Sequence, residues 1–331
     1  MRLALTIAAV ALVVLRATTA GAQTTPTELP DDGRLEVIKV QGNVWMLAGA
    51  GGNIAVQAGD QGIIVVDTGA GNLTDTVIGA IRGISTRPIR YIINTSGATQ
   101  HVGGNATLAS LPGGSTSPRQ RGARPSVIAQ ENVHSRMMRP SAQGGVPFPS
   151  AGWPTDAYYA PRRGLIFNGE AIDILHMPNA STNGDSIVYF RGSNVLVTGD
   201  IFTTTNFPMI DRTHGGSYAG LLDALNTLLD TTVPDDLMEG GTYIIPGHGR
   251  ICDEADLVEY RDMVHQVRDR LKKTITDRGL PREEVKAARP LIGWERRYSQ
   301  PGWTTEMFID AVYAEFAAQR SKSGRATGAP R

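Results

Sequence analysis

The first part of the chain repeats short runs of aliphatic and β-branched residues that are separated by glycine-rich turns. Such runs, bounded by turn residues, predict a meander of antiparallel strands. They lie at Leu35–Val40, Val44–Leu47, Ile54–Val56 and Ile63–Val66. Apolar residues at helical spacing follow over Leu73–Ile84, with Asn72 as the expected cap, and a buried strand is predicted at Ile89–Ile93.

The second part of the chain repeats this order of strands and helices. Strands are predicted at Val127–Ala129, around Leu165–Leu175, and at Ile187–Phe190, Val195–Val197 and Thr242–Ile245. Helices are predicted near Glu131–Met138 and at Ala219–Leu229, where the leucines share one face. This order favours an α/β fold of the αββα type, in which two mixed β-sheets pack face to face and helices flank them.

The chain after residue 248 has a mainly helical pattern. A long helix is expected to begin near Asp253, because acids fill its first turn and apolar residues recur at helical spacing up to Leu271. Further helices are predicted at 281–289 and 304–319. Residues 321–331 contain few apolar side chains, so they are predicted to form a disordered tail.

The N-terminus has the pattern of a secretory signal. Arg2 precedes an apolar run from Leu3 to Leu15, and Ala20-Gly21-Ala22 supplies the small residues of a cleavage site. The run is too short to span a bilayer, so residues 1–22 are interpreted as a signal peptide. The sequence therefore predicts an exported protein, periplasmic or extracellular, with one domain at 23–320 and no membrane anchor after cleavage near Ala22.

Composition narrows the range of partners. The 331 residues include 32 Lys and Arg and 32 Asp and Glu, so the formal net charge is zero. A nucleic-acid partner would require a basic patch, so a small-molecule substrate or ligand is expected instead, and the oligomeric state is left open. Cys252 is the only cysteine, which excludes an intramolecular disulfide. It is either a buried small side chain or a metal ligand four residues after His248.

Chemically distinctive residues collect where the predicted strands end. The loop at 94–105 reads Asn-Thr-Ser-Gly-Ala-Thr-Gln-His-Val-Gly-Gly-Asn. Other strand ends carry Asp67-Thr68-Gly69, Ala180–Ser186, Thr198-Gly199-Asp200 and Pro246-Gly247-His248. In this order the segments resemble those of the metallo-β-lactamase-fold hydrolase superfamily, over roughly residues 36–250.

The resemblance implies where metal ligands would lie. In two-metal members of the family, histidines of the first site occupy the positions that here hold Ser96, Ala98 and Ser181. The chain therefore resembles a divergent member in which the first-site ligands are replaced. The second-site positions hold Gln100, His101, Asp200 and His248.

Two imidazoles and one carboxylate thus remain as ligands of a single divalent ion. Zinc accepts three protein ligands plus water in catalytic sites, so we expect zinc at His101, Asp200 and His248. Iron in its ferrous form also suits this ligand set. Gln100 stands where the family has an aspartate, and its neutral amide would lower the affinity for the ion. Asp200 and, to a lesser extent, Gln100 are the candidate catalytic residues.

Two further residues are candidates for supporting roles. The resemblance implies that Asp67 orients a ligand, although the same carboxylate could instead cap its own turn. His214 lies in the loop that follows the Asp200 strand, and loops in that position border the cleft of the family. His214 is therefore a candidate for lining the pocket.

Two functions follow from these residues. The first is a secreted hydrolase that uses a single metal-activated water against an ester, amide or lactone bond. The second is a catalytically inactive pseudoenzyme without a metal, which would act as a binding protein on the same scaffold. Ser96 and Ser181 could also be nucleophiles. However, no Gly-x-Ser-x-Gly turn surrounds either serine, so replacement of a ligand is favoured. Turnover of β-lactams is not expected.

Overall fold

The computed structural model describes residues 35–113, 123–139 and 147–326. The predicted signal peptide at 1–22 and residues 327–331 of the predicted tail lie outside these ranges. In the described part of the chain, no helix has the length and apolar character needed to cross a membrane.

The first sheet begins with the predicted meander, which is confirmed. Among the described residues the sheet has seven strands in chain order, antiparallel up to β4 and parallel from β4 onward. They are β1 (Glu36–Gln41), β2 (Val44–Ala50), β3 (Gly52–Gly59), β4 (Gly62–Val66), β5 (Ile89–Ile93), β6 (Ser126–Gln130) and β7 (Asp156–Tyr158). The short strand β7 was not predicted, because three residues at a sheet edge leave no periodic pattern.

The second sheet has five strands within the described ranges, in the order β12-β11-β10-β9-β8. They are β8 (Arg162–Phe167), β9 (Glu170–His176), β10 (Ser186–Phe190), β11 (Val195–Val197) and β12 (Tyr243–Ile245). Only the β11–β12 pair is parallel, so both sheets are mixed. The predicted αββα sandwich is confirmed.

Side chains alternate between the two faces of each strand, and this alternation places them in different layers of the core. In β4, Ile63 and Val65 pack with Val77 and Ile81 of α1 (Thr74–Ile84). Ile64 and Val66 of the same strand belong instead to the core between the two sheets. Successive side chains of a strand point to opposite faces, so a strand that is apolar at every position is covered on both sides.

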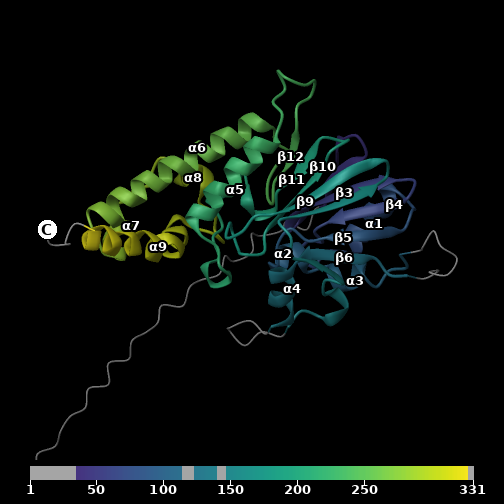
Figure 1. The fold of residues 1–331 in the computed structure, drawn as a ribbon, viewed down its shortest axis with the longest axis horizontal. Coiled ribbons are helices and arrows are strands. Elements are labelled where there is room, and N and C mark those ends of the chain that lie inside the picture. The colour runs from purple at the N-terminus through teal and green to yellow at the C-terminus, as the bar shows by residue number, and fades with distance from the viewer. Residues whose placement is uncertain (1–34, 114–122, 140–146, 327–331) are drawn as a thin grey trace, which may run out of the picture.

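A third core lies between the second sheet and the C-terminal helices (Figure 1). These are α5 (Tyr218–Thr231), α6 (Glu254–Leu271), α7 (Arg282–Ala287), α8 (Glu295–Tyr298) and α9 (Thr305–Ala326). A π-helical segment at Lys272–Asp277 continues α6. The remaining helices are α2 (Thr99–Val102), α3 (Asn105–Leu108) and α4 (Glu131–Met138), with single 3-10 turns at Ser150–Gly152, Gly199–Ile201 and Arg212–His214.

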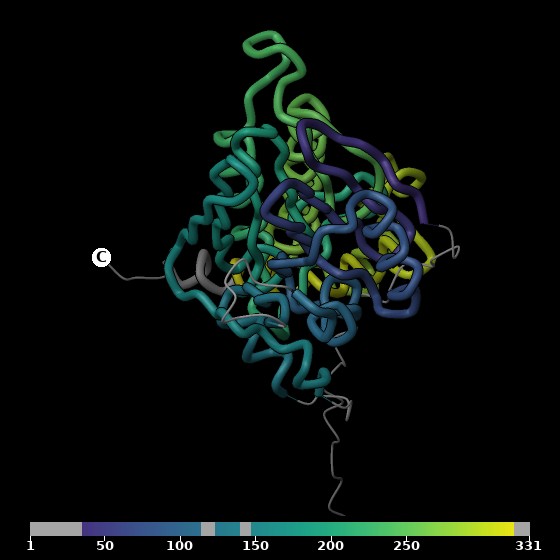
Figure 2. Tube along the Cα trace, turned by 90° about the vertical axis from the view of Figure 1, so that its right-hand side faces the viewer, coloured from purple at the N-terminus to yellow at the C-terminus, as the bar shows by residue number. Residues whose placement is uncertain are grey.

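Two predictions about helix ends were wrong. Asn72 does not cap α1, because Leu73 occupies the N-cap and no side chain bonds there. The last helix does not end at 319 but reaches Ala326, so the tail predicted to be disordered is helical over 321–326. Figure 2 also shows the chain between α5 and β12 projecting from the body. This projection enters β12 at the end opposite to His248.

Candidate metal centre

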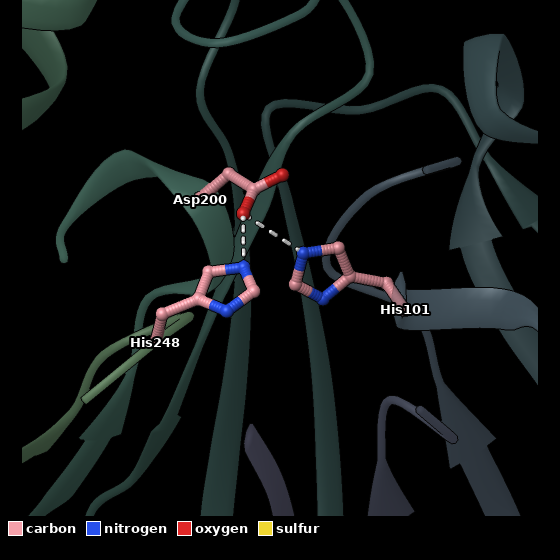
Figure 3. A group of neighbouring side chains, drawn as sticks. All are labelled: His101, Asp200 and His248. Atoms are coloured by element: carbon pink, nitrogen blue, oxygen red, sulfur yellow. Dashed lines mark ion pairs between the residues drawn. The ribbon is translucent and has the colours of Figure 1, made fainter. Parts of the chain in front are cut away.

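The ends of strands from both sheets bring the predicted ligands together. His101 lies in the short helix α2 after β5, Asp200 follows β11, and His248 follows β12. Figure 3 shows the two imidazoles and the carboxylate turned toward one another. All three side chains are buried. The sandwich therefore assembles one group from segments that lie far apart in the sequence.

The geometry of this group leaves its inner atoms unsatisfied. His101 Nε2 lies 3.0 Å and His248 Nε2 lies 3.4 Å from Asp200 Oδ1, as ion-pair contacts. One ligand atom from each residue falls within 4.8 Å of the others. Among the described residues, these two nitrogens and this oxygen have no hydrogen-bond partner. Buried polar atoms are normally paired, so three that converge without partners fit the donor set of a metal ion.

Asp67 fixes the orientation of His101 from behind. Its Oδ2 lies 2.7 Å from His101 Nδ1, and its carboxylate accepts bonds of 2.8 Å and 2.5 Å from the backbone N–H and hydroxyl of Thr95. In the neutral imidazole, a proton on Nδ1 that points to Asp67 leaves the Nε2 lone pair directed at the centre of the group. Asp67 adopts the left-handed φ of 62°, which Asp tolerates better than most residues. The contact with His101 agrees with the orienting role implied by the resemblance.

The charges of the group are coupled. Burial lowers the pKa of His101, but the carboxylates of Asp200 and Asp67 outweigh it and raise this pKa well above its ordinary value. Burial by itself would raise the pKa of Asp200. The charges and hydrogen bonds of His101 and His248 outweigh burial, so the pKa of Asp200 lies below its ordinary value. Without an ion, a proton on His101 therefore balances the buried carboxylates. A metal ion would have to displace that proton.

Gln100 lies beside the same carboxylate. Its Nε2 donates to Asp200 Oδ2 at 3.4 Å, and the side chain is buried. The bond occupies the oxygen of Asp200 that the histidines leave free. Gln100 thus presents an N–H donor to Asp200 rather than an oxygen to the centre of the group.

The positions assigned to the first site contain groups that are already bonded. Ser181 donates to the backbone carbonyl of Asp200 at 3.0 Å, and Ser96 Oγ accepts from the N–H of Ala98 at 3.4 Å. In the described ranges, the only group of three or more His, Cys, Asp or Glu residues able to hold an ion is His101, Asp200 and His248. Within the described part of the chain, neither serine is hydrogen-bonded to a histidine, which removes the geometric basis of the nucleophile alternative.

His214 and Cys252 do not join the group. His214 Nδ1 lies 2.6 Å from Oδ2 of Asp211, three residues earlier, and the His214 side chain is 34% exposed. Asp211 in turn donates its backbone N–H to the carbonyl of Ser181. Cys252 is buried, and its thiol bonds to the carbonyl of Arg250. Burial raises the pKa of this thiol to about 12, which disfavours a thiolate ligand.

Sequence reasoning missed Asn53. This buried side chain donates to the carbonyls of Pro246 and Gly249, at 2.9 Å and 3.0 Å, on either side of His248. The partners are separated by 193 and 196 positions in the sequence, so no local pattern could have predicted the contact. The only local signal was a polar residue near the start of a largely apolar strand.

Comparisons with known proteins agree with this arrangement. A family model described as the metallo-beta-lactamase superfamily matches residues 41–248. A metallo-beta-lactamase from Pontibacter korlensis is 17% identical with a TM-score of 0.52, covering 70% of this chain and 99% of its own. DIM-1 metallo-beta-lactamase is 16% identical with a TM-score of 0.53, over 72% of this chain and 100% of its own.

A third solved structure extends over more of the chain. The stereoselective inverting sec-alkylsulfatase Pisa1 from Pseudomonas sp. is 13% identical with a TM-score of 0.61. The match covers 90% of this chain but 52% of the alkylsulfatase, so this chain spans about half of that protein. A comparison with curated proteins gives no match. At these identities the structural likeness concerns the fold.

Proposed function

The chain belongs to the metallo-β-lactamase superfamily, and from this premise we propose that it is a hydrolase that holds one divalent metal ion. The ligands would be His101, Asp200 and His248. The observation that carries the proposal is the convergence of three buried ligand atoms that have no hydrogen-bond partner among the described residues. An unpaired buried polar group costs about 1–3 kcal/mol, so such a cluster is understandable if an ion satisfies it. Zinc is the first candidate and ferrous iron the second.

Each residue has a separate task in this proposal. A bound divalent ion would acidify a water molecule and polarise the bond to be cleaved. Asp67 holds the Nδ1 proton of His101, which keeps Nε2 available as a ligand. Gln100 holds Oδ2 of Asp200, which leaves Oδ1 facing the histidines. Asp200 would supply the anionic ligand through Oδ1, the oxygen that faces both histidines.

The proposed substrate has an ester, amide or lactone bond. Single-metal chemistry suits these bonds because one ion can both supply the nucleophile and stabilise the developing charge. The likeness to an alkylsulfatase adds sulfate esters to the substrates that should be tested. We also propose that the protein is exported and that residues 1–22 are removed as a signal peptide, since their sequence has the basic start, apolar run and small-residue site of such segments.

The test combines metal content with hydrolysis. We expect elemental analysis of the purified protein to find at most one tightly held ion per chain. We also expect hydrolysis of at least one ester, amide, lactone or sulfate ester in a broad panel, lost with a chelator and restored by zinc or ferrous iron. His101→Ala should remove both the ion and the activity. Absence of metal together with absence of turnover would contradict the proposal.

A pseudoenzyme is the second candidate, and one observation favours it. Ser96 and Ser181 form hydrogen bonds with the backbone, so the first half of the site is complete without any ion. A binding protein would show saturable binding of a small molecule that persists in chelator and in His101→Ala. The metal-dependent hydrolase would lose its activity under both conditions.

A further inference from the structure

The residues Gly52 and Asn53 lie between the two histidine loops. They begin β3, an inner strand of the first sheet that pairs with β2 and β4. A Cβ added at Gly52 would lie 3.0 Å from the carbonyl oxygen of Gln100, 3.5 Å from His101 Cε1 and 3.6 Å from the carbonyl oxygen of Gly247. The backbone of Gly52 therefore fills the gap between the loop of His101 and the loop of His248.

Asn53 then ties the His248 loop to the same strand. Its side-chain amide donates to the carbonyls of Pro246 and Gly249, and its backbone N–H donates to the carbonyl of Gly247 at 2.8 Å. The loop follows β12 of the second sheet, so these bonds join one sheet to the other. On its remaining side the loop is held by the segment that follows Asp200, where the N–H of Thr204 donates to the carbonyl of His248 at 3.2 Å.

We propose that Gly52 and Asn53 form an intersheet spacer, which sets the separation of His101 and His248 and so the affinity for a metal ion. Gly52 limits how closely the two loops approach, and Asn53 limits how far they move apart. Both are positioning residues, because neither offers a ligand atom to the group. The inference rests on the proposed function, since it concerns the ion that His101 and His248 would share. A ligand separation must hold to about 0.5 Å for a productive site, which is why contacts behind the ligands affect affinity.

Two substitutions test the two contacts separately. Asn53→Asp keeps the size of the side chain but places a carboxylate oxygen against two carbonyl oxygens, so the tether is lost. The added negative charge would by itself attract a cation, and a fall in affinity would therefore reflect geometry. Gly52→Ala adds one methyl 3.0 Å from a backbone oxygen, which must move by a few tenths of an ångström. Gly52 does not adopt a positive φ, so its backbone tolerates alanine.

Each variant has a matched control. Asn194 is another buried asparagine; its amide donates to the carbonyl of Gly241 at 2.6 Å, and it lies at the end of β11 opposite to Asp200. Asn194→Asp likewise places a carboxylate against a backbone carbonyl, and it should leave metal binding unchanged. Gly164 in β8 has nothing within 4 Å of an added Cβ, so Gly164→Ala controls for a methyl group on a strand.

The main readout is zinc affinity, measured by competition with a chromophoric chelator. We expect Asn53→Asp to weaken zinc binding by about 10–100-fold and Gly52→Ala by about tenfold, the range found when partners behind metal ligands are changed. The visible absorption of bound cobalt(II) should shift in both variants, because it reports ligand geometry. Both controls should bind zinc and cobalt as the wild type does. Affinities of the two variants within about twofold of the wild type would overturn the spacer, as would equal losses in the controls.

A metal-free measurement separates this inference from the proposed function. Amide hydrogen exchange over residues 243–252 should be faster in Asn53→Asp than in Asn194→Asp, at equal free energy of unfolding. If the wild type binds no divalent ion, the proposed function fails. The exchange result alone then shows whether Asn53 holds the His248 loop in place. Unchanged exchange would overturn that tether. If Asn53→Asp does not fold, Gly52→Ala against Gly164→Ala decides the proposal.

Discussion

On the side of His101 and His248, buried ring nitrogens face a carboxylate oxygen and have no hydrogen-bond partner among the described residues. On the side of Ser96 and Ser181, each hydroxyl is bonded to the backbone. Both sides are equally buried, so burial does not separate them. What differs is whether the polar atoms are satisfied within the protein. A buried polar atom without a partner points to a missing ligand, whereas a satisfied one is complete as it stands.

The largest expected effect comes from removing a ligand on the unsatisfied side. His248→Ala should abolish tight binding of a divalent ion, because two protein ligands would remain. We expect the affinity to fall by more than about 100-fold, beyond the range for partners that only support a ligand. Isothermal titration with zinc measures the loss. A variant that still retained one equivalent of zinc after dialysis would contradict the assignment of His248.

On the side of Ser96 and Ser181, the titratable group to test is the carboxyl of Asp185. Asp185 is buried and accepts both bonds of Thr182, at 2.6 Å from the backbone N–H and 2.6 Å from the hydroxyl. Burial raises the pKa of this carboxyl from an ordinary 3.8 to about 7, against the bonds from Thr182 and with help from the charge of Asp200. Between these pH values the folded protein keeps a proton that the unfolded chain has released. The free energy of unfolding should therefore fall as the pH rises from about 4 to about 7.

The size of this effect follows from the shift. About three pKa units correspond to roughly 4 kcal/mol at most. Asp185→Asn should remove that slope while adding a constant offset from the altered bonds to Thr182. Urea unfolding of both proteins between pH 4 and 8, in chelator, gives the comparison. Equal slopes in the two proteins would show that Asp185 does not titrate in this range.

Gln100 contacts Asp200, the carboxylate that faces His101 and His248, through a hydrogen bond to Oδ2. Its substitution can therefore be compared in the absence and in the presence of zinc. In Gln100→Asp a second carboxylate would replace the amide that now donates to Asp200. Without an ion the two carboxylates repel each other, and with an ion both can serve as ligands. We expect the unfolding temperature to fall without zinc and to rise with saturating zinc, and the zinc affinity to increase by about tenfold. Thermal unfolding with and without zinc checks both signs.

The smallest effect is expected from Ser181→Ala. The variant loses one hydrogen bond to the carbonyl of Asp200, which corresponds to about 1 kcal/mol of stability. Zinc stoichiometry and affinity should stay at wild-type values, because the serine offers nothing to the ion. Urea unfolding and a zinc titration provide both numbers. A loss of zinc binding as large as that of His248→Ala would remove the distinction between the two sides.

The fold could be predicted largely from apolar patterning. The boundaries of Ile89–Ile93, Glu131–Met138 and Val195–Val197 agree with the structure, because these segments are set off by polar or turn residues. The strand β7 and the π-helical segment Lys272–Asp277 were missed. The first is short, and the second differs from an α-helix only in its hydrogen bonding. Neither difference leaves a trace in the spacing of apolar residues.

The candidate site could be predicted only in part. His101, Asp200 and His248 follow from motifs at strand ends, and the structure brings them together. The tether from Asn53 could not be predicted, since it depends on how the two sheets are placed relative to each other. The proposal that His214 lines the pocket stays a prediction; its imidazole is paired with Asp211, and it is not one of the three ligand residues.

The origin of the ligands in two different sheets has a consequence for the whole chain. His101 and His248 are separated by 147 residues (248 − 101). An ion bound to both would join these two distant segments in the folded protein only, because the three ligands are no longer assembled once the chain unfolds. With Cys252 as its only cysteine, the chain has no disulfide to do this. The free energy of unfolding would then depend on the concentration of free metal. It would rise by about 2.7 kcal/mol at a metal concentration 100 times the dissociation constant. Metal supply would thus govern how much of the protein stays folded.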